Sequence, residues 1–409
     1  MRERSSFHVL VIGGGIGGLC LAQGLKQSGI GVAVYERDQS AYFRRQGYRL
    51  HMNPDGSHAL HDCLPEYLFQ LFVATSGQPA MGRLVTYDSQ LREVASRPPH
   101  HLAAASPFEL NAEVNRLTLR EILLAGLDEI VHFGKALERF EHLDKGKVLA
   151  TFADGTEASG DVLVGADGTH SVTRQILLPQ ARVPEVGFAI YGKTPLTPLA
   201  MTWLPQSVIE DFSSVTGPSG VAMMFGVYRK REEEAFATAR YAPHLHLTET
   251  PDYLMWTFRA EFAQLGLGEE EFWHADPAAL HAAASRLAEA WHPSLRRIVA
   301  EAEIPATFSV SFRASEPVKP WQATNVTLLG DAIHTMPPFR GVGANTALRD
   351  AALLRRKLVD AATKGVPLVQ AVDEYEAAMQ DYGFEAVRTT LERPLFGPPG
   401  SGSRREAAS

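Results

Sequence analysis

The sequence predicts an α/β protein in which a mixed parallel sheet with helices is interrupted by an inserted antiparallel sheet and followed by C-terminal helices. Three observations support this prediction. The chain opens with a strand–helix–strand pattern, its middle contains apolar runs of strand length, and its end returns to helical spacing. At 409 residues it also exceeds the usual size of one hydrophobic core, so we expect two interleaved domains.

The first elements are expected to form a βαβ unit. The apolar run from Phe7 to Ile12 ends in glycines, as a buried strand of a parallel sheet does. A helix should follow, because apolar residues then recur at helical spacing up to a stop at Gly29. A second strand is predicted from Val32 to Glu36.

The remaining elements divide the chain into alternating segments. A helix is predicted over Glu113–Leu127, and a meander over Lys147–Gly165 turns at Asp154 and Gly155. Further strands are expected at Gly220–Tyr228, Tyr253–Phe262 and Asn325–Leu329, and helices from about Gly343 and over Leu368–Val387. We assign 1–82, 110–182 and 313–362 to the first domain, 83–109 and 183–312 to the inserted domain, 363–393 to a C-terminal helix and 394–409 to a disordered tail.

Composition excludes several classes of function. A net charge of −8 lacks the basic surface expected of a nucleic-acid-binding protein. Cys20 and Cys63 are the only cysteines and lack disulfide or metal spacing, and the histidine pairs His100–His101 and His244–His246 lack ligand partners, so no metal is expected. No apolar stretch is long enough for a signal peptide or a membrane span. These features favour a cytoplasmic protein, and we expect it to be a monomer or a homodimer.

A glycine motif follows the first predicted strand. Gly13, Gly15 and Gly18 form Gly-x-Gly-x-x-Gly, with Ile16 and Gly17 inside it, at the start of the predicted helix. Such glycines let a helix N-terminus approach a pyrophosphate, whose charge is favoured by free N–H groups. Glu36, followed by Arg37, ends the second strand where a carboxylate can accept hydrogen bonds from a ribose. The pattern indicates a Rossmann-like dinucleotide site without separating FAD from NAD.

Two later segments carry a resemblance to a known family. Asp161–Arg174, with Asp167 and Gly168, and Gly330–Ala351, with Asp331, resemble the Asp-Gly and Gly-Asp segments of class A, single-component FAD-dependent monooxygenases. The nearest subgroup is similar to the tetracycline-inactivating and polyketide-tailoring enzymes. One departure is Gly341-Val342-Gly343, where the family usually has Gly-Gln-Gly.

The resemblance implies a role for each matching residue. Asp331 would hydrogen-bond the FAD ribityl chain, and the loop that runs to the helix start would lie along the isoalloxazine ring. His334 would orient that loop, and Arg49 and Arg116 match positions where family arginines approach FAD. The residues implied in FAD binding, besides those of the glycine motif and Glu36–Arg37, are Arg49, Arg116, Asp167, Gly330, Asp331, Gly341, Gly343, Ala344 and Asn345.

The implied chemistry belongs mainly to the flavin, so no catalytic side chain is assigned. NADPH or NADH would bind transiently and reduce FAD, and O₂ would give a C4a-hydroperoxide that inserts one oxygen atom into a small aromatic or polycyclic substrate. Hydroxylation is expected first, with Baeyer–Villiger oxidation or epoxidation as variants. The inserted sheet would exclude water. Its expected substrate-lining residues are Tyr191, Met224, Phe225, Trp256 and Phe258, together with Phe339 of the flavin loop.

Other functions stay open at this point. A flavin dehydrogenase or oxidase would use the same motifs without inserting oxygen. A flavin-binding regulatory module would show little turnover. A flavin-dependent halogenase is disfavoured because the Trp-x-Trp-x-Ile-Pro segment of that family is absent.

Overall fold

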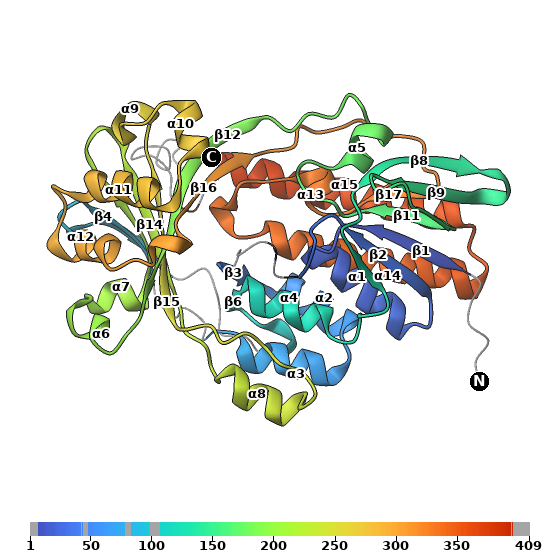
Figure 1. The fold of residues 1–409 in the computed structure, drawn as a ribbon, viewed down its shortest axis with the longest axis horizontal. Coiled ribbons are helices and arrows are strands. Elements are labelled where there is room, and N and C mark those ends of the chain that lie inside the picture. Colours follow the sequence, from blue (N-terminus) through green and yellow to red (C-terminus); the bar gives the residue numbers. More distant parts are fainter. Residues whose placement is uncertain are drawn as a thin grey trace, which may run out of the picture.

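The computed structural model describes residues 7–41, 43, 48–77, 83–98, 107–393 and 395. Within these residues the strands form four sheets. Figure 1 shows two lobes along the long axis, one built around a parallel sheet and the other around a mostly antiparallel sheet backed by short helices. The α/β class predicted from the sequence is confirmed.

The parallel sheet is the centre of the first lobe. Among the described strands its order is β17–β11–β1–β2–β7, with every neighbouring pair parallel. These strands are short and almost fully buried, as expected for strands covered on both faces. Their bounds are β1 His8–Ile12, β2 Gly31–Glu36, β7 Val131–Phe133, β11 Val162–Gly165 and β17 Val326–Leu328.

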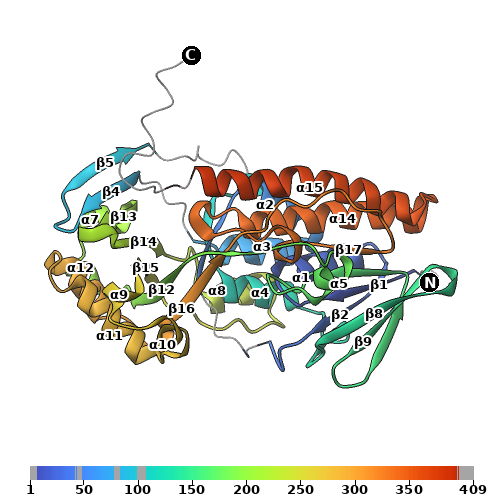
Figure 2. The ribbon, with the colours of Figure 1, turned by 90° about the horizontal axis from the view of Figure 1, so that it is seen from above.

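Helices cover one face of this sheet and a small antiparallel sheet covers the other. Helix α1 (Ile16–Gln27) packs between the parallel sheet and α14 (Gly343–Lys364), and α15 (Leu368–Glu392) runs beside α14 in Figure 2. The other face packs against β8 (Leu137–Leu143), β9 (Lys147–Phe152) and β10 (Glu157–Gly160) through a separate apolar cluster. The predicted hairpin at Asp154–Gly155 joins β9 to β10, with Gly155 at a φ of 80°.

The second lobe is a larger sheet with the described strand order β16–β12–β15–β14–β13–β4–β5. Its pairs are antiparallel except β13 with β4. The bounds are β4 Leu84–Asp88, β5 Glu93–Arg97, β12 Glu185–Pro195, β13 Phe212–Thr216, β14 Ala222–Tyr228, β15 Tyr253–Arg259 and β16 Phe308–Arg313. One face packs against helices α6 Ala200–Trp203, α7 Gln206–Glu210, α9 Phe262–Leu265, α10 Glu269–His274, α11 Pro277–Ala288 and α12 Pro293–Ala300. The opposite face is turned toward the first lobe.

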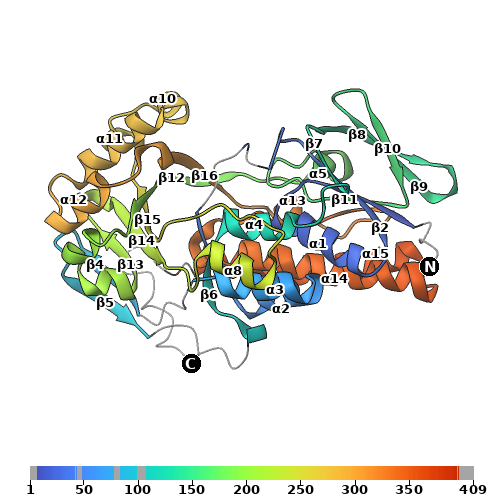
Figure 3. The ribbon, with the colours of Figure 1, turned by 60° about the horizontal axis from the view of Figure 1, so that its bottom comes forward.

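A two-stranded sheet and four helices lie between the two lobes or, in the view of Figure 1, below them. Strand β3 (Arg49–Met52) pairs with β6 (Ala112–Asn115). In Figure 3 the helices gather along the lower edge, where α3 packs against both α4 and α8. Their bounds are α2 Pro54–Cys63, α3 Glu66–Thr75, α4 Arg116–Leu124 and α8 Glu234–Tyr241. None of the described helices is long and apolar enough to cross a membrane.

The structure corrects some predicted boundaries. The helix expected over Glu113–Leu127 begins only at Arg116, because residues up to Asn115 pair with β3. The Asn115 side chain then caps the helix by accepting from the Leu117 N–H at 2.9 Å. At the other end of the chain, α15 continues to Glu392, five residues past the predicted end at Val387. Apart from residue 395, the tail predicted to be disordered lies outside the described residues.

Candidate active site

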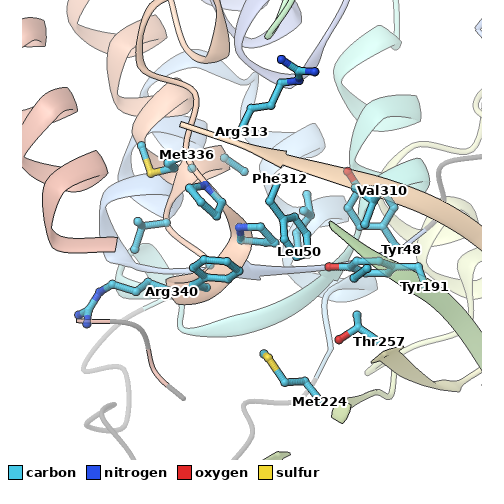
Figure 4. A pocket seen from close by; sticks show the side chains of 18 of the residues that line it. Tyr48, Leu50, Tyr191, Met224, Thr257, Val310, Phe312, Arg313, Met336 and Arg340 are labelled. Carbon is cyan, nitrogen blue, oxygen red and sulfur yellow. The ribbon is translucent and has the colours of Figure 1, made fainter. Parts of the chain in front are cut away.

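A large cavity separates the two lobes. Its volume is about 1730 Å³, more than the roughly 300–1,000 Å³ of a usual small-molecule pocket, so it has room for two ligands. One end reaches the glycine loop at Gly15–Gly18, and the opposite wall is the free face of the large sheet. Figure 4 shows Tyr191, Thr257 and Met224 on the sheet side, across from Met336 and Arg340.

The glycine loop leaves space where a phosphate would bind. A side chain on Gly13 or Gly18 would meet backbone oxygens at 2.3 and 2.2 Å, so these two positions require glycine for packing. In contrast, nothing lies within 4 Å of a side-chain carbon built on Gly15, which lines the cavity directly before α1. The N-terminal N–H groups of a twelve-residue helix therefore face open space.

Glu36 and Arg120 hold this loop in place. The two Glu36 carboxylate oxygens accept from the Gly14 N–H at 2.7 Å and the Asp38 N–H at 2.9 Å. Arg120, one turn into α4, donates to the Gly14 carbonyl at 3.2 Å. Arg120 is buried, and it was not among the residues predicted from the sequence to belong to the site. Glu36 itself is buried and Arg37 is exposed, and neither lines the cavity.

The Asp-Gly segment is joined to the Gly-Asp segment by an arginine. Asp167 caps helix α5 (Val172–Leu177), accepting from the Val172 N–H at 2.9 Å, while its buried Oδ1 has no hydrogen-bond partner in the described part of the chain. Arg174 on that helix donates to the Ala332 carbonyl at 2.9 Å and to the Thr169 carbonyl at 2.8 Å. Two segments far apart in sequence thus form one wall.

Asp331 begins the short helix α13 (Asp331–His334) with its side chain open to the cavity. Burial among protein atoms raises its pKa, although the charges of His334 and Arg116 act in the opposite direction. Behind it, His334 is fully buried, and its Nε2 lies 2.7 Å from Oδ2 of Asp350 on α14. The same carboxylate accepts from the Gly330 N–H at 2.8 Å, which fixes the loop from behind.

The loop that precedes α14 is tied to β3 by Asn345. Its Nδ2 donates to the His51 carbonyl at 2.8 Å and to the Gly341 carbonyl at 3.0 Å, and its Oδ1 accepts from the Asn53 N–H at 2.9 Å. Gly341 has a φ of 66°, which favours glycine. All four residues from Gly341 to Ala344 line the cavity, and Val342 also packs against the apolar cluster of Met336 and Val387.

Both predicted arginines line the cavity but already have protein contacts. Arg49 pairs with Glu113 at 2.5 Å and lies 4.8 Å over the Phe212 ring. Arg116 lies 5.6 Å over the Tyr48 ring. Glu113 and His51, whose Nδ1 is 3.5 Å from the Glu113 carboxylate, also line the cavity and were missed by sequence reasoning. Only the pairing of β3 with β6 brings these charges together.

Three of the six predicted substrate-lining residues reach the cavity, namely Tyr191, Met224 and Phe339. The structure corrects the prediction for Phe225, Trp256 and Phe258, which are fully buried in the core on the other face of the sheet. Successive side chains of a strand point to opposite faces, so Met224 and Phe225 cannot share one. The face could not be chosen from the sequence, because the register of strand pairing was unknown. Once β15 is aligned, Thr257 and Arg259 become the cavity-facing residues.

No group of three or more His, Cys, Asp or Glu in the described residues is arranged to hold a metal ion. His100 and His101 lie outside the described residues. Cys20 and Cys63 are free and buried.

Family comparisons agree with this geometry. A model described as an FAD binding domain matches residues 272–390, and one described as an NAD(P)-binding Rossmann-like domain matches residues 11–87. A solved structure from Photorhabdus luminescens subsp. laumondii, described as an FAD containing monooxygenase, is 33% identical with a TM-score of 0.80, covering 94% of this chain and 97% of that one. A tetracycline destructase at 17% identity and a TM-score of 0.62 shares the fold.

Curated relatives extend the match. The dual O-methyltransferase/FAD-dependent monooxygenase of Cercospora beticola is 35% identical over 91% of this chain and 44% of its own length. The FAD-dependent monooxygenase of Penicillium herquei is 28% identical, covering 94% of this chain and 90% of that protein. This chain therefore spans about half the length of the dual-function relatives that it matches.

The parallel sheet, its glycine loop and the cavity that faces a second sheet define a dinucleotide-binding flavoprotein fold. The chain belongs to the FAD-dependent monooxygenases. The family resemblance recognised in the Asp-Gly and Gly-Asp segments is confirmed.

Proposed function

We propose that this chain is an NAD(P)H- and FAD-dependent monooxygenase that inserts one atom of O₂ into an aromatic or polycyclic substrate. The observation that carries the proposal is the single cavity that runs from the glycine loop, past Asp331, to the apolar face of the large sheet. A cofactor end and a substrate end in one shared cavity suit a reaction in which the cofactor and the substrate must meet away from bulk water. Residues 83–109 and 183–312 would form the substrate-binding domain.

The residues at the cofactor end fit FAD. The N–H groups of Gly15–Gly18 and the α1 N-terminus would hold the pyrophosphate, and Glu36 would accept from the adenosine ribose through its remaining lone pairs. Asp331 would bind the ribityl chain, and the Gly341–Asn345 loop with the α14 N-terminus would bind the isoalloxazine. When bound, FAD supplies the redox chemistry and the activation of oxygen.

The substrate end combines apolar contacts with few polar groups. Tyr191 is stacked on Phe308 with ring centroids 5.4 Å apart, and Val310, Phe312 and Met224 continue the lining. Such a wall favours a flat apolar ligand and keeps water away. The relatives that also carry an O-methyltransferase support a substrate or product with an oxygen atom that can be methylated. Hydroxylation is the expected reaction, with Baeyer–Villiger oxidation or epoxidation as variants.

A basic surface beside the Asp-Gly segment supports transient binding of an anionic nicotinamide dinucleotide. His170 lines the cavity mouth, and its pKa is lowered by burial and then by the charges of Arg313, Arg37 and Arg174. A phosphate placed there would meet several positive groups. No second glycine-rich nucleotide motif is evident in the sequence, so this surface is the proposed contact for NADPH or NADH.

The test is to load the purified protein with FAD and follow NADPH, NADH and O₂ consumption with a panel of polycyclic phenols and ketones. A product heavier by one oxygen atom, labelled when ¹⁸O₂ is used, supports monooxygenation. A product changed by two hydrogens would instead identify a dehydrogenase or oxidase. Bound FAD with no substrate-stimulated turnover across the panel would favour the flavin-binding regulatory module.

A further inference from the structure

The cavity face of the large sheet carries a cation, Arg259, at the last residue of β15. Strand pairing places Arg259 of β15 opposite Ala222 of β14, and Ala222 opposite Thr216 of β13. On the other side of β15, the pairing of Ile190 with Phe258 places Ala189 beside Arg259. The neighbours on both sides are therefore alanines, whose methyl groups leave space beside the guanidinium.

Arg259 differs from the other arginines that line the cavity. Arg49 is paired with Glu113, Arg116 contacts Tyr48, Arg313 donates to the Val183 carbonyl, and Arg340 donates to the Arg393 carbonyl. The Arg259 side chain forms no hydrogen bond or ion pair with the part of the chain that the structure describes. Glu261, two residues further on, also lines the cavity but forms no ion pair with it.

The position of Arg259 suits the outer end of a long substrate. Thr257 precedes it by two residues on the same face, a separation of about 6.6 Å along a strand. Thr257, Tyr191 and Met224 form the apolar middle of the wall, so Arg259 would meet the end of a substrate whose rings cover them. Guanidinium is a planar fork that binds two oxygens sharing one negative charge.

From this placement we infer that Arg259 forms an anion subsite for the substrate, which binds a pair of oxygens sharing one negative charge on the end of an aromatic ring system. A carboxylate and the enolate of a hydroxyquinone or β-dicarbonyl present the same pair of oxygens. The inference rests on the proposed function and narrows its substrate class from aromatic or polycyclic compounds in general to anionic ones.

The experiment measures binding to the oxidised FAD-loaded enzyme from the change in the flavin absorption spectrum, without turnover. Three probes are used: 1-hydroxy-2-naphthoate, its neutral methyl ester, and 2-hydroxy-1,4-naphthoquinone, whose hydroxyl is acidic. The wild-type enzyme is expected to bind the carboxylate about tenfold or more tightly than the ester, as a charge-assisted hydrogen bond provides. In Arg259→Gln this preference should disappear while the affinity for the ester stays the same.

Three further variants keep the outcome interpretable. Arg259→Lys retains the positive charge but lacks the planar guanidinium, so it should keep part of the preference for the carboxylate over the ester. Glu261→Gln removes a neighbouring negative charge and should strengthen binding of the anion only. Arg296→Gln, an exposed arginine on α12, makes the same charge change away from the cavity and should alter neither affinity. Circular dichroism spectra of all variants should coincide. The Arg259 side chain is exposed and forms no hydrogen bond or ion pair with the residues that the structure describes.

The outcomes separate this inference from the proposed function. A wild-type enzyme that binds the carboxylate no better than the ester, or binds neither, overturns the subsite, as does a preference that survives in Arg259→Gln. Loss of affinity in Arg259→Gln for both anions, or for only one of them, supports the subsite. The pattern shows whether the subsite binds a carboxylate, the enolate of a hydroxyquinone, or both. Oxygen insertion into a neutral phenol would leave the proposed function intact even if the subsite fails.

Discussion

Glu376 is a carboxyl group buried beneath the first lobe's sheet, where most proteins place an apolar residue. It lies on α15 with 2% of its surface exposed, and its Oε1 accepts from the Thr327 hydroxyl at 2.7 Å. Burial raises its pKa to about 7, although the hydrogen bond from Thr327 acts in the opposite direction. The neutral form is therefore favoured by the fold.

The raised pKa predicts that ionisation of Glu376 at high pH lowers the free energy of unfolding. Above its ordinary pKa of 4.5 the unfolded chain releases the proton, while the folded protein retains it until about pH 7. Stability from this group is thus complete below pH 4.5 and is lost as pH rises through 7. We expect Glu376→Gln to be more stable than wild type at pH 8 by about 1–3 kcal/mol, and to show no such advantage at pH 5.

Urea unfolding at both pH values measures this difference. The matched control is Glu374→Gln, two residues earlier on the same helix, where the contact with Lys357 lowers the pKa of an exposed carboxyl. Glu374→Gln should not raise the free energy of unfolding at pH 8. Equal stability of Glu376→Gln and wild type at pH 8 would show that the carboxyl is not strained by burial.

At the scale of elements, one carboxylate joins four parts of the cofactor wall. Asp350 on α14 accepts from the Gly330 N–H after β17, contacts His334 of α13, and accepts from the Tyr382 hydroxyl of α15 at 2.6 Å. Burial lowers the pKa of His334, but the charge and hydrogen bond of Asp350 outweigh it, so the net shift is upward. The side chains of this network support Asp331 from behind and do not line the cavity, whereas Gly330 does.

Asp350→Asn should therefore lower the free energy of unfolding by about 2–4 kcal/mol, because a buried charge loses its counterpart. His334, with a pKa raised above 6.5, contributes its stability fully below that pH and loses it as pH rises through the raised value. The loss of unfolding free energy in Asp350→Asn should be larger at pH 6 than at pH 9. Tyr382→Phe, which removes one hydrogen bond, should cost only about 1 kcal/mol. An Asn variant as stable as wild type at pH 6 would refute the network's role.

Neighbouring residues of β14 should respond in opposite ways to truncation. Phe225 is fully buried in the core behind the sheet, so Phe225→Ala should cost about 3–5 kcal/mol of stability. Met224 lines the cavity, so Met224→Ala should cost less than about 1 kcal/mol, and Met224→Trp should weaken binding of a polycyclic ligand by filling its space. Thermal unfolding and ligand titration of the three variants measure both effects. Similar losses of stability at 224 and 225 would contradict the assignment of faces.

At the scale of the whole molecule, local patterns predicted more of the first lobe than of the second. The βαβ unit could be predicted because its strand, glycine loop and helix follow one another in sequence. Met224 could not be separated from Phe225, because the choice of face depends on pairing with strands more than 30 residues away. Arg120, Glu113 and His51 were missed for the same reason, since their partners lie far along the chain.

FAD would connect segments that the fold only brings near one another, namely the glycine loop, Asp331 and the start of α14. A ligand that binds only the folded state stabilises it by about 2.7 kcal/mol at a hundredfold excess over its Kd. The apoprotein should therefore show a melting temperature that rises with FAD concentration. Asp331→Ala should reduce this rise at each concentration, because its side chain faces the cavity, while Asp373→Ala, on α15 outside the cavity lining, should not. If Asp331→Ala and wild type respond equally to FAD, Asp331 does not contact the cofactor, and the role transferred to it from the family is wrong.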